Sequence, residues 1–564
     1  KYQSAAKTME NFLVHPQGAA TRRVGTQFIS EVKSSAAKTR LIPFEFSTTQ
    51  TYILEFGNQY IRFYKDKGQI VTGSPAVAYE IATPYLTAEL FDIKFAQSAD
   101  VMYLVHPNHN VRKLSRTGHT SWTLATVSFT GSPSLPIAGA NNRPSCVSFY
   151  EQRLAFAGTN NNPQTIWFSK AGDYENFTTG TNADDAMIYT IASNQVNAIR
   201  YLKAQRTLVV GTSGGEFTVS ADGTDASITP TNVTIKKQSS YGSANVDAVA
   251  AGNAILFLQK AKRKIRELAY NFDSDSYVAP DLTILNDAVT ESGIVQMEWQ
   301  QEPDNILWCV REDGQLAALT YQRSEAVVSW HRHILGGSFG SGNSVVESIA
   351  SISGVLNEDE LWCIVKRTIN GSTKRYVECF SDFDFDETDA TAFKFLDSHL
   401  TYSGSATTTL SGLSHLEGQT VSILADGSVH ANKTVSSGSI TLDRSVTKAV
   451  VGLSYDSVLQ TMRIEGGAAE GTSQGKTKRI SKVVLRLFET VGVKVGPSLS
   501  NLETIPFRTT SSNLSAPVET LLEGDKEIEF NDDFNSDGFI FIKQDQPLPA
   551  SILAIYPTLV TNDG

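Results

Sequence analysis

Apolar residues in this chain come in short runs that alternate with polar ones. Residues 52–56 (YILEF) and 60–64 (YIRFY) are two such runs, separated by Gly57, Asn58 and Gln59. Val, Ile, Thr, Phe and Tyr dominate the runs and Gly, Asn, Asp and Ser lie between them, which is typical of strands joined by tight turns. Helical structure is predicted in only two places. Residues 1–13 are expected to form a helix or an arm, and residues 88–93 one or two helical turns. The pattern predicts an all-β protein without parallel βαβ units.

The alternating runs recur at a nearly constant spacing of about 50 residues, and a second run follows each of them after a turn. The first members begin at Ile53, Met102, Leu154, Leu208, Ile255, Ile306 and Leu361. One hairpin cannot bury its faces in water, whereas copies that each grow to about four strands can stack as blades around an axis. We therefore predict a β-propeller-like core with six or seven hairpin repeats, six if the first hairpin belongs to an N-terminal layer. The alternative is a series of unrelated hairpins in two sandwiches.

Changes in amino-acid composition and in the apolar pattern divide the chain into five predicted parts. Residues 1–50 form an N-terminal arm or platform, 51–380 the propeller-like repeats, and 381–399 an acidic linker. Residues 400–460 are rich in Thr, Ser, Val and Gly and predict a small inserted β-barrel or sandwich, at a tip or a rim. Residues 461–564 predict a C-terminal β-sandwich layer.

Composition excludes several classes. The chain has 564 residues, a formal net charge of −11 and a pI near 5.4, which argues against a dedicated nucleic-acid binder. Four cysteines in this length do not make a disulfide framework. No apolar run reaches the ~20 residues of a membrane helix, and the polar first residues lack the apolar region of a signal peptide.

Histidines are the first candidate metal ligands. His106, His109 and His119 lie close in sequence, but no Cys or carboxylate stands at zinc-ligand spacing nearby, so surface-loop histidines are the preferred interpretation. His331 and His333 point to the same side of a predicted strand, where a polar strand face or a subunit contact is favoured over a metal.

Two acidic runs, residues 382–386 and 533–538, imitate the start of a calcium loop. Such a loop needs Glu at its twelfth position, where Phe393 and Gln544 stand, so a solvated acidic edge and a turn are favoured. No nucleophile elbow and no carboxylate pair suited to glycoside hydrolysis stands out. We expect no metal ligand, no cofactor and no catalytic residue, and hence no enzyme.

One strong positive cluster lies on a predicted hairpin turn. It comprises Lys260, Lys262, Arg263, Lys264 and Arg266. Such a cluster can touch phosphates, or it can meet an acidic neighbouring subunit. In an acidic protein the subunit contact is the preferred interpretation.

Residues 11–28 (NFLVHPQGAATRRVGTQF) are the first segment that resembles a known protein family. They hold Asn-Phe, a Pro-Gln-Gly turn, Arg-Arg and Gly-Thr-x-Phe in succession, and residues 40–47 (RLIPFEFS) and 52–57 (YILEFG) follow. Together with residues 95–103, 153–158, 413–418 and 544–549, these segments resemble the tail nozzle proteins (tail tubular protein B class) of short-tailed bacteriophages and related prophages. The resemblance spans most of the chain, and its opening block is the most specific part.

The resemblance implies a structural protein of the virion tail. Nozzle proteins form a ring, usually of six copies, below the portal and the adaptor, and build the tube through which DNA is ejected. The implied partners are further copies of the chain, the tail adaptor, tail fibres or spikes, and DNA that passes without sequence-specific binding. No catalytic residue belongs to this class.

The net charge suits such a conduit, because six copies of a chain with charge −11 carry −66 in total. Salt screens repulsion of DNA over ~8 Å, so only carboxylates that face the lumen matter. The candidates are Asp382, Asp384, Asp386, Glu387, Asp532, Asp533 and Asp537. The alternative function is a receptor-binding or glycan-degrading propeller of the tail, and a third is a propeller scaffold outside a virion.

Overall fold

The computed structural model describes residues 5–131, 142–192, 196–223, 226–354, 358–383, 389–466, 472–507 and 521–562. The chain is all-β, with a few short 3-10 helices such as η2 (Thr87–Asp92), where helical turns were expected. The start of the chain is extended instead of helical, as β1 (Ala6–Glu10) and β2 (Phe12–Val14). Among the residues described, no helix has the length and apolar character to cross a membrane.

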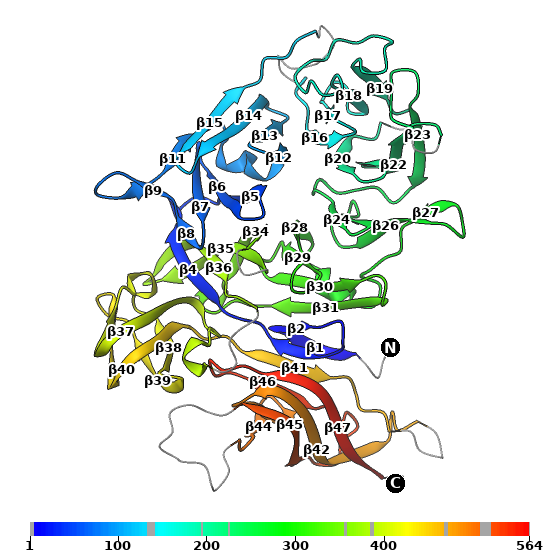
Figure 1. The fold of residues 1–564 in the computed structure, drawn as a ribbon. Helices are drawn as coiled ribbons and strands as arrows, with labels where there is room; N and C mark the ends of the chain where they lie inside the picture. Colours follow the sequence, from blue (N-terminus) through cyan, green and yellow to red (C-terminus); the bar gives the residue numbers. More distant parts are fainter. Residues whose placement is uncertain are drawn as a thin grey trace.

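In the described residues, seven blades of four main strands each form a β-propeller, which fills the upper part of Figure 1. Blade one consists of β5 (Arg40–Ser47), β6 (Gln50–Gly57), β7 (Tyr60–Lys65) and β11 (Glu80–Ala82), and blade two of β12 (Lys94–Ser98), β13 (Val101–His106), β14 (His109–Gly118) and β15 (Ser121–Thr126). Blade three consists of β16 (Cys146–Tyr150), β17 (Arg153–Ala157), β18 (Thr165–Phe168) and β19 (Met187–Thr190), and blade four of β20 (Ile199–Ala204), β21 (Leu208–Thr212), β22 (Gly215–Ser220) and β23 (Thr234–Ser239). Blade five consists of β24 (Val249–Ala251), β25 (Ala254–Leu258), β26 (Ile265–Asn271) and β27 (Ser276–Val278). Blade six consists of β28 (Ile294–Gln300), β29 (Ile306–Arg311), β30 (Leu316–Gln322) and β31 (Val327–His333). Blade seven consists of β34 (Val345–Ser353), β35 (Asp359–Ile369), β36 (Ser372–Phe380) and β4 (Thr26–Glu31).

The predicted hairpins are the second and third strands of these blades. Ile53 pairs with Tyr64 in the first blade, and Leu307 pairs with Leu319 in the sixth. The first hairpin makes a blade of its own, so the repeat number is seven. Apolar side chains of adjacent blades share cores; Trp122, for example, stacks on Phe63 at 4.6 Å between ring centroids.

The N-terminal segment closes the propeller. β4 adds to β36 as the outer strand of the seventh blade, with Gln27 opposite Cys379. β5 then begins the first blade, and its Leu41 N–H donates to Ser348 Oγ on β34 at 3.0 Å. The boundary predicted at residue 50 is therefore wrong, because β4 and β5 belong to blades. Sequence patterns do not reveal which distant strand an isolated strand will join.

The predicted insertion extends the sheet of the seventh blade. β37 (Asp397–Ser411) meets β4 in parallel at His399 and Gln27 and pairs with β40 (Ser439–Leu453), which is followed by β38 (Thr420–Ala425) and β39 (Ser428–Thr434). The unit, yellow in Figure 1, has a core of its own that includes Leu416, Ile423 and Val451.

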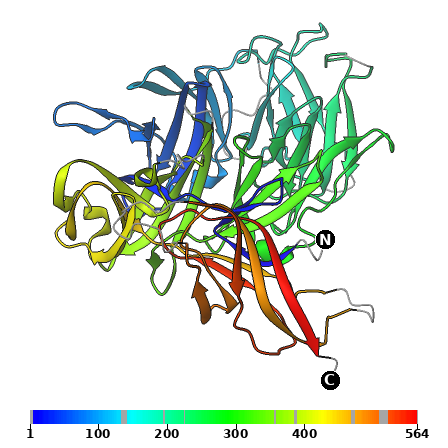
Figure 2. The ribbon, with the colours of Figure 1, turned by 60° about the horizontal axis from the view of Figure 1, so that its bottom comes forward.

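Two sheets pack as a sandwich at the C-terminal end, below the propeller in Figures 1 and 2. One sheet runs β2, β3 (Ala20–Arg22), β47 (Ser551–Asn562), β42 (Thr477–Thr490) and β45 (Leu522–Glu529). The other continues blade six from β31 through β1, β41 (Ser457–Thr461), β46 (Phe541–Gln544), β43 (Lys494–Ser498) and β44 (Asn501–Thr504). Ile480, Val483 and Ile542 are among the residues buried between them. The remaining short elements are β8 (Gly68–Gln69), β9 (Val71–Thr72), β10 (Val77–Ala78), β32 (Ser338–Phe339), β33 (Gly342–Asn343), η3 (Asp287–Thr290), η4 (Ala390–Ala392) and η5 (Ser414–Leu416).

Candidate functional sites

The block that carries the family resemblance lies at a buried junction. Arg23 donates from Nη1 and Nη2 to the two carboxylate oxygens of Asp397 at 2.8 and 2.7 Å, and from Nε to Asn11 Oδ1 at 2.9 Å. The backbone N–H groups of Thr26 and Gly336 donate to the same carboxylate at 3.1 and 2.7 Å. Burial by itself would raise the pKa of Asp397, but Arg23 and these donors hold it below its usual range. Asp397 is therefore a buried anion with its hydrogen bonds satisfied.

A second buried ion pair adjoins the first. Arg367 donates to both carboxylate oxygens of Glu378, and Thr26 Oγ1 donates to the same side chain at 2.6 Å. Both charged side chains are inaccessible to solvent. Thr26 thus touches both pairs, so β4, β36 and the start of β37 are held by one connected network.

Arg22 completes the junction on the opposite side. It donates to the backbone carbonyls of Tyr455, Gln546 and Leu548, the first and last at 2.9 Å. The Tyr455 ring lies 3.7 Å from the guanidinium carbon of Arg23 and 4.5 Å from that of Arg22. Propeller, insertion and sandwich therefore meet on two adjacent arginines of the N-terminal segment.

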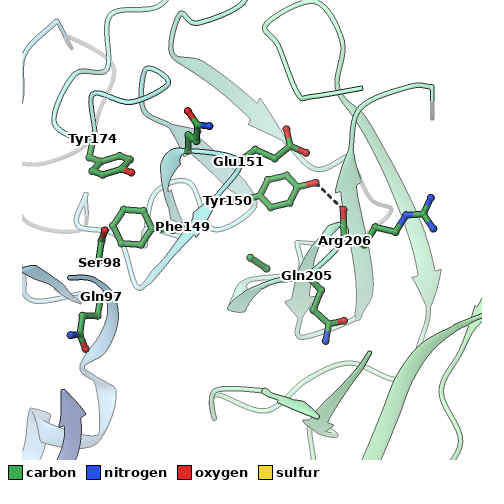
Figure 3. Close-up of a pocket in the computed structure, with 10 residues that line it drawn as sticks. Gln97, Ser98, Phe149, Tyr150, Glu151, Tyr174, Gln205 and Arg206 are labelled. Carbon is green, nitrogen blue, oxygen red and sulfur yellow. Dashed lines mark hydrogen bonds between the residues drawn. The ribbon is translucent and has the colours of Figure 1, made fainter. Parts of the chain in front are cut away.

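A separate pocket of about 460 Å³ opens where the first strands of blades two, three and four end (Figure 3). It is lined by Gln97, Ser98, Phe149, Tyr150, Glu151, Gln152, Tyr174, Ala204, Gln205 and Arg206. Glu151 and Gln152 form the β16–β17 turn with φ of 43° and 58°. Two-residue hairpin turns with positive φ favour Asn and Gly, so longer side chains here store some backbone strain, which is common at binding sites.

The pocket presents aromatic rings beside polar groups. Phe149 and Tyr174 meet edge to face with centroids 4.9 Å apart, and the Glu151 carboxylate accepts the Ile228 N–H at 2.7 Å. Glu151 is the single carboxylate in the lining, whereas glycoside hydrolysis commonly uses two. The arrangement can bind a small polar ligand such as a sugar, by contact with the rings and hydrogen bonds to the polar groups.

The first strands of the blades bring charged residues of several blades to the propeller axis. Glu298 on β28 lies within the electrostatic reach of Arg40 on β5 and Lys203 on β20, and its burial raises its pKa to about 7. Lys94 on β12 pairs with Asp247 at 3.2 Å. These first strands thus bring together charges of both signs, with Lys94 and Asp247 as an ion pair.

The candidate lumen carboxylates do not come together as one exposed cluster in the described chain. Asp382 pairs with Lys67 and with Lys394, the latter at 3.6 Å; burial would raise its pKa, but the two lysines keep it low. Asp532 is 6% exposed in the sandwich, and burial raises its pKa. Asp537 pairs with Arg463 at 2.7 Å and Asp533 is exposed. Asp384, Asp386 and Glu387 lie outside the described residues.

The basic cluster lies at the β25–β26 turn of blade five, as predicted, with Arg266 in the first part of β26. Lys264 pairs with Asp281 at 2.9 Å, and Arg266 lies over the Tyr241 ring at 3.5 Å. Lys260, Lys262 and Arg263 are exposed. Two of the five cations therefore serve the blade itself and three point to solvent.

Several histidines differ from expectation because the blade cores include them. His106 is 2% exposed, so it is not a surface-loop residue. His119 is an exposed residue of the β14–β15 turn, as predicted, with its Nδ1 2.7 Å from the Tyr52 hydroxyl. His331 and His333 point the same way as predicted, but they are buried, with His331 Nδ1 2.7 Å from His333 Nε2. That burial excludes a subunit contact in the folded chain.

The predicted turn over residues 533–538 is correct, because the Asn535 side chain accepts the N–H groups of Asp537 and Gly538 at 2.9 and 2.7 Å. Cys309 and Cys363 occupy equivalent buried strands, β29 and β35, as the repeat predicts.

Comparisons with known proteins give only distant structural similarities. No protein-family description matches the chain, and no curated protein matches it in sequence. One similar solved structure is the β-propeller domain of Myceliophteria thermophila Cps50 (Swd1), with 9% identity and a TM-score of 0.37, over 63% of this chain and 99% of that one. Another is the Neurospora crassa Pan2 WD40 domain, with 10% identity and a TM-score of 0.37, over 64% and 96% of the two chains.

Proposed function

We propose that this chain is a structural protein of a bacteriophage tail, a nozzle subunit that assembles as a ring of six around a DNA conduit. The observation that carries the proposal is the location of the block that resembles nozzle proteins. Asn11, Arg22, Arg23 and Thr26 of that block lie at the buried junction of propeller, insertion and sandwich. Such a junction suits a wall element whose parts must hold their relative positions while DNA passes.

The exposed basic turn of blade five supplies a candidate ring contact. Lys262 and Arg263 project from an acidic molecule, so an acidic surface of the next subunit is a complementary partner. In a ring this contact is heterologous, with a different surface on each side.

Electron microscopy of the purified chain, alone and with the adaptor ring of a short-tailed phage, tests the proposal. We expect closed six-fold rings with a central channel when the adaptor is present. The double variant Lys262→Glu/Arg263→Glu should fold normally but form few rings, and Lys264→Glu, at a cation already paired with Asp281, is the comparison variant. A chain that stays monomeric beside the adaptor contradicts the proposal.

A second candidate function, recognition of a surface saccharide, is favoured by the pocket at Phe149 and Tyr174. Its test is calorimetric titration with oligosaccharides of the host surface. Binding that Tyr174→Ala abolishes, in a chain that forms no ring, would favour the receptor-binding alternative.

A further inference from the structure

A cluster of two histidines and one carboxylate lies between blades one and two. Glu89 comes from η2, the connection between the blades, and His106 and His109 face each other across the two-residue β13–β14 turn. A ligand atom of each residue lies within 4.8 Å of the other two. Sequence spacing did not suggest the carboxylate, because Glu89 belongs to a different turn.

The cluster contains buried polar atoms that the protein leaves without partners. His106 is 2% exposed, and its Nε2 has no hydrogen-bond partner among the described residues. The hydroxyl of Tyr85, a fully buried residue, likewise has no partner in the part of the chain that the structure describes. The Tyr85 ring lies 5.0 Å from the His109 ring and 6.1 Å from the His106 ring. Unpartnered buried groups are costly, and a ligand bound beside these rings would give His106 a polar partner.

The rest of the site is held in place. His109 Nε2 lies 2.8 Å from Glu89 Oε2, which also accepts the Leu86 N–H at 2.9 Å. Arg143 donates to the Asn108 carbonyl at 2.7 Å and fixes the turn between the histidines.

We propose that Glu89, His106 and His109 bind a divalent transition metal, with Zn²⁺ the best match to two imidazoles and a carboxylate. Zinc holds such donors at ~2.0–2.2 Å, often with three protein ligands and one water. Donors within 4.8 Å need to approach by little more than about 1 Å to reach that geometry. The bound ion would fasten the η2 connection to the β13–β14 turn and so join blade two to blade one.

Coordination has one local cost. The Asn108 N–H donates to His106 Nδ1 at 3.0 Å, which leaves the ring proton on Nε2. A metal at Nε2 needs that proton removed or moved to Nδ1, and the Asn108 amide then loses its acceptor. We therefore expect weaker binding than at a site whose imidazole already presents a free Nε2 lone pair.

Calorimetric titration of the untagged, EDTA-treated chain with ZnCl2 tests the proposal, and Co²⁺ absorption reports the coordination. We expect one site per chain. His106→Ala and Glu89→Gln should each raise the Kd at least about ten-fold, while His119→Ala, a histidine of the same blade outside the cluster, should not change it. Thermal unfolding with and without zinc gives a second measurement, because the ion should raise the Tm of the wild type but not of Glu89→Gln. Absence of zinc uptake by the wild type, or equal uptake by Glu89→Gln, overturns the proposal.

Discussion

Removing the charge of Asp397 should be among the most damaging single changes in this chain. Asp397→Asn keeps the size of the side chain but leaves Arg23 charged, buried and without its anion. Both side chains are 0% exposed, and the carboxylate accepts two guanidinium and two backbone N–H bonds at 2.7–3.1 Å. Breaking a buried ion pair by removing one partner costs about 3–5 kcal/mol, and the amide also turns an N–H group toward some of these donors.

Urea denaturation at pH 7 measures this loss in the free energy of unfolding. The exposed pair Arg486–Asp525, bidentate at 2.8 and 2.9 Å, provides the matched variant Asp525→Asn, which should change stability little because solvent screens that pair. The double variant Arg23→Met/Asp397→Leu should be less damaging than the sum of the single variants, since no lone charge remains. A loss for Asp397→Asn as small as that for Asp525→Asn would refute the reasoning.

The contribution of ionised Asp397 to the free energy of unfolding depends on pH in a definite direction. Its folded-state pKa is lowered, so the stabilisation is present above the unfolded value near ~3.9 and is lost as the pH falls through the folded value. Asp397→Asn should therefore lose less stability than the wild type when the pH falls below about 4.

Two further predictions concern buried groups. Burial lowers the pKa of His331 to about 3 and that of His333 well below its usual range, so only the unfolded chain takes up these protons below ~6.5. Urea denaturation should show stability falling from pH 7 to pH 5, less steeply in His331→Gln; equal slopes would contradict this. Burial also raises the pKa of all four thiols, so a disulfide reagent should label them only on unfolding, and rapid labelling of the native chain would argue against it. The thiols are Cys146, Cys309, Cys363 and Cys379.

The blades were predictable because their central hairpins are local structures. A run such as residues 52–56, a turn and residues 60–64 specify their own pairing, and Ile53 does lie opposite Tyr64. The closure of the propeller was not predictable, because β4 pairs with β36, which lies more than 300 residues away in sequence. No local pattern encodes that choice.

The candidate sites, too, were predictable only where their residues lie close together in sequence. The sequence singled out His106 and His109 but not Glu89, which reaches them because the connection before a blade and the turn between its second and third strands meet at one edge. Asp382 was chosen for its acidic neighbours in sequence, yet its environment is set by Lys67, distant in sequence. Side chains that meet through blade geometry become visible only once the blade register is known.

The adjacent arginines explain why the N-terminal block specifies more than a strand. Successive side chains of an extended segment point to opposite sides, so Arg22 reaches the Leu548 carbonyl while Arg23 reaches Asp397. Each contact uses several N–H groups of a planar guanidinium, which a lysine cannot reproduce. Arg23→Lys would keep the charge but lose the paired hydrogen bonds, and with them the orientation of the insertion relative to the sandwich. A short Arg-Arg step can therefore fix the arrangement of the propeller, the insertion and the sandwich relative to one another.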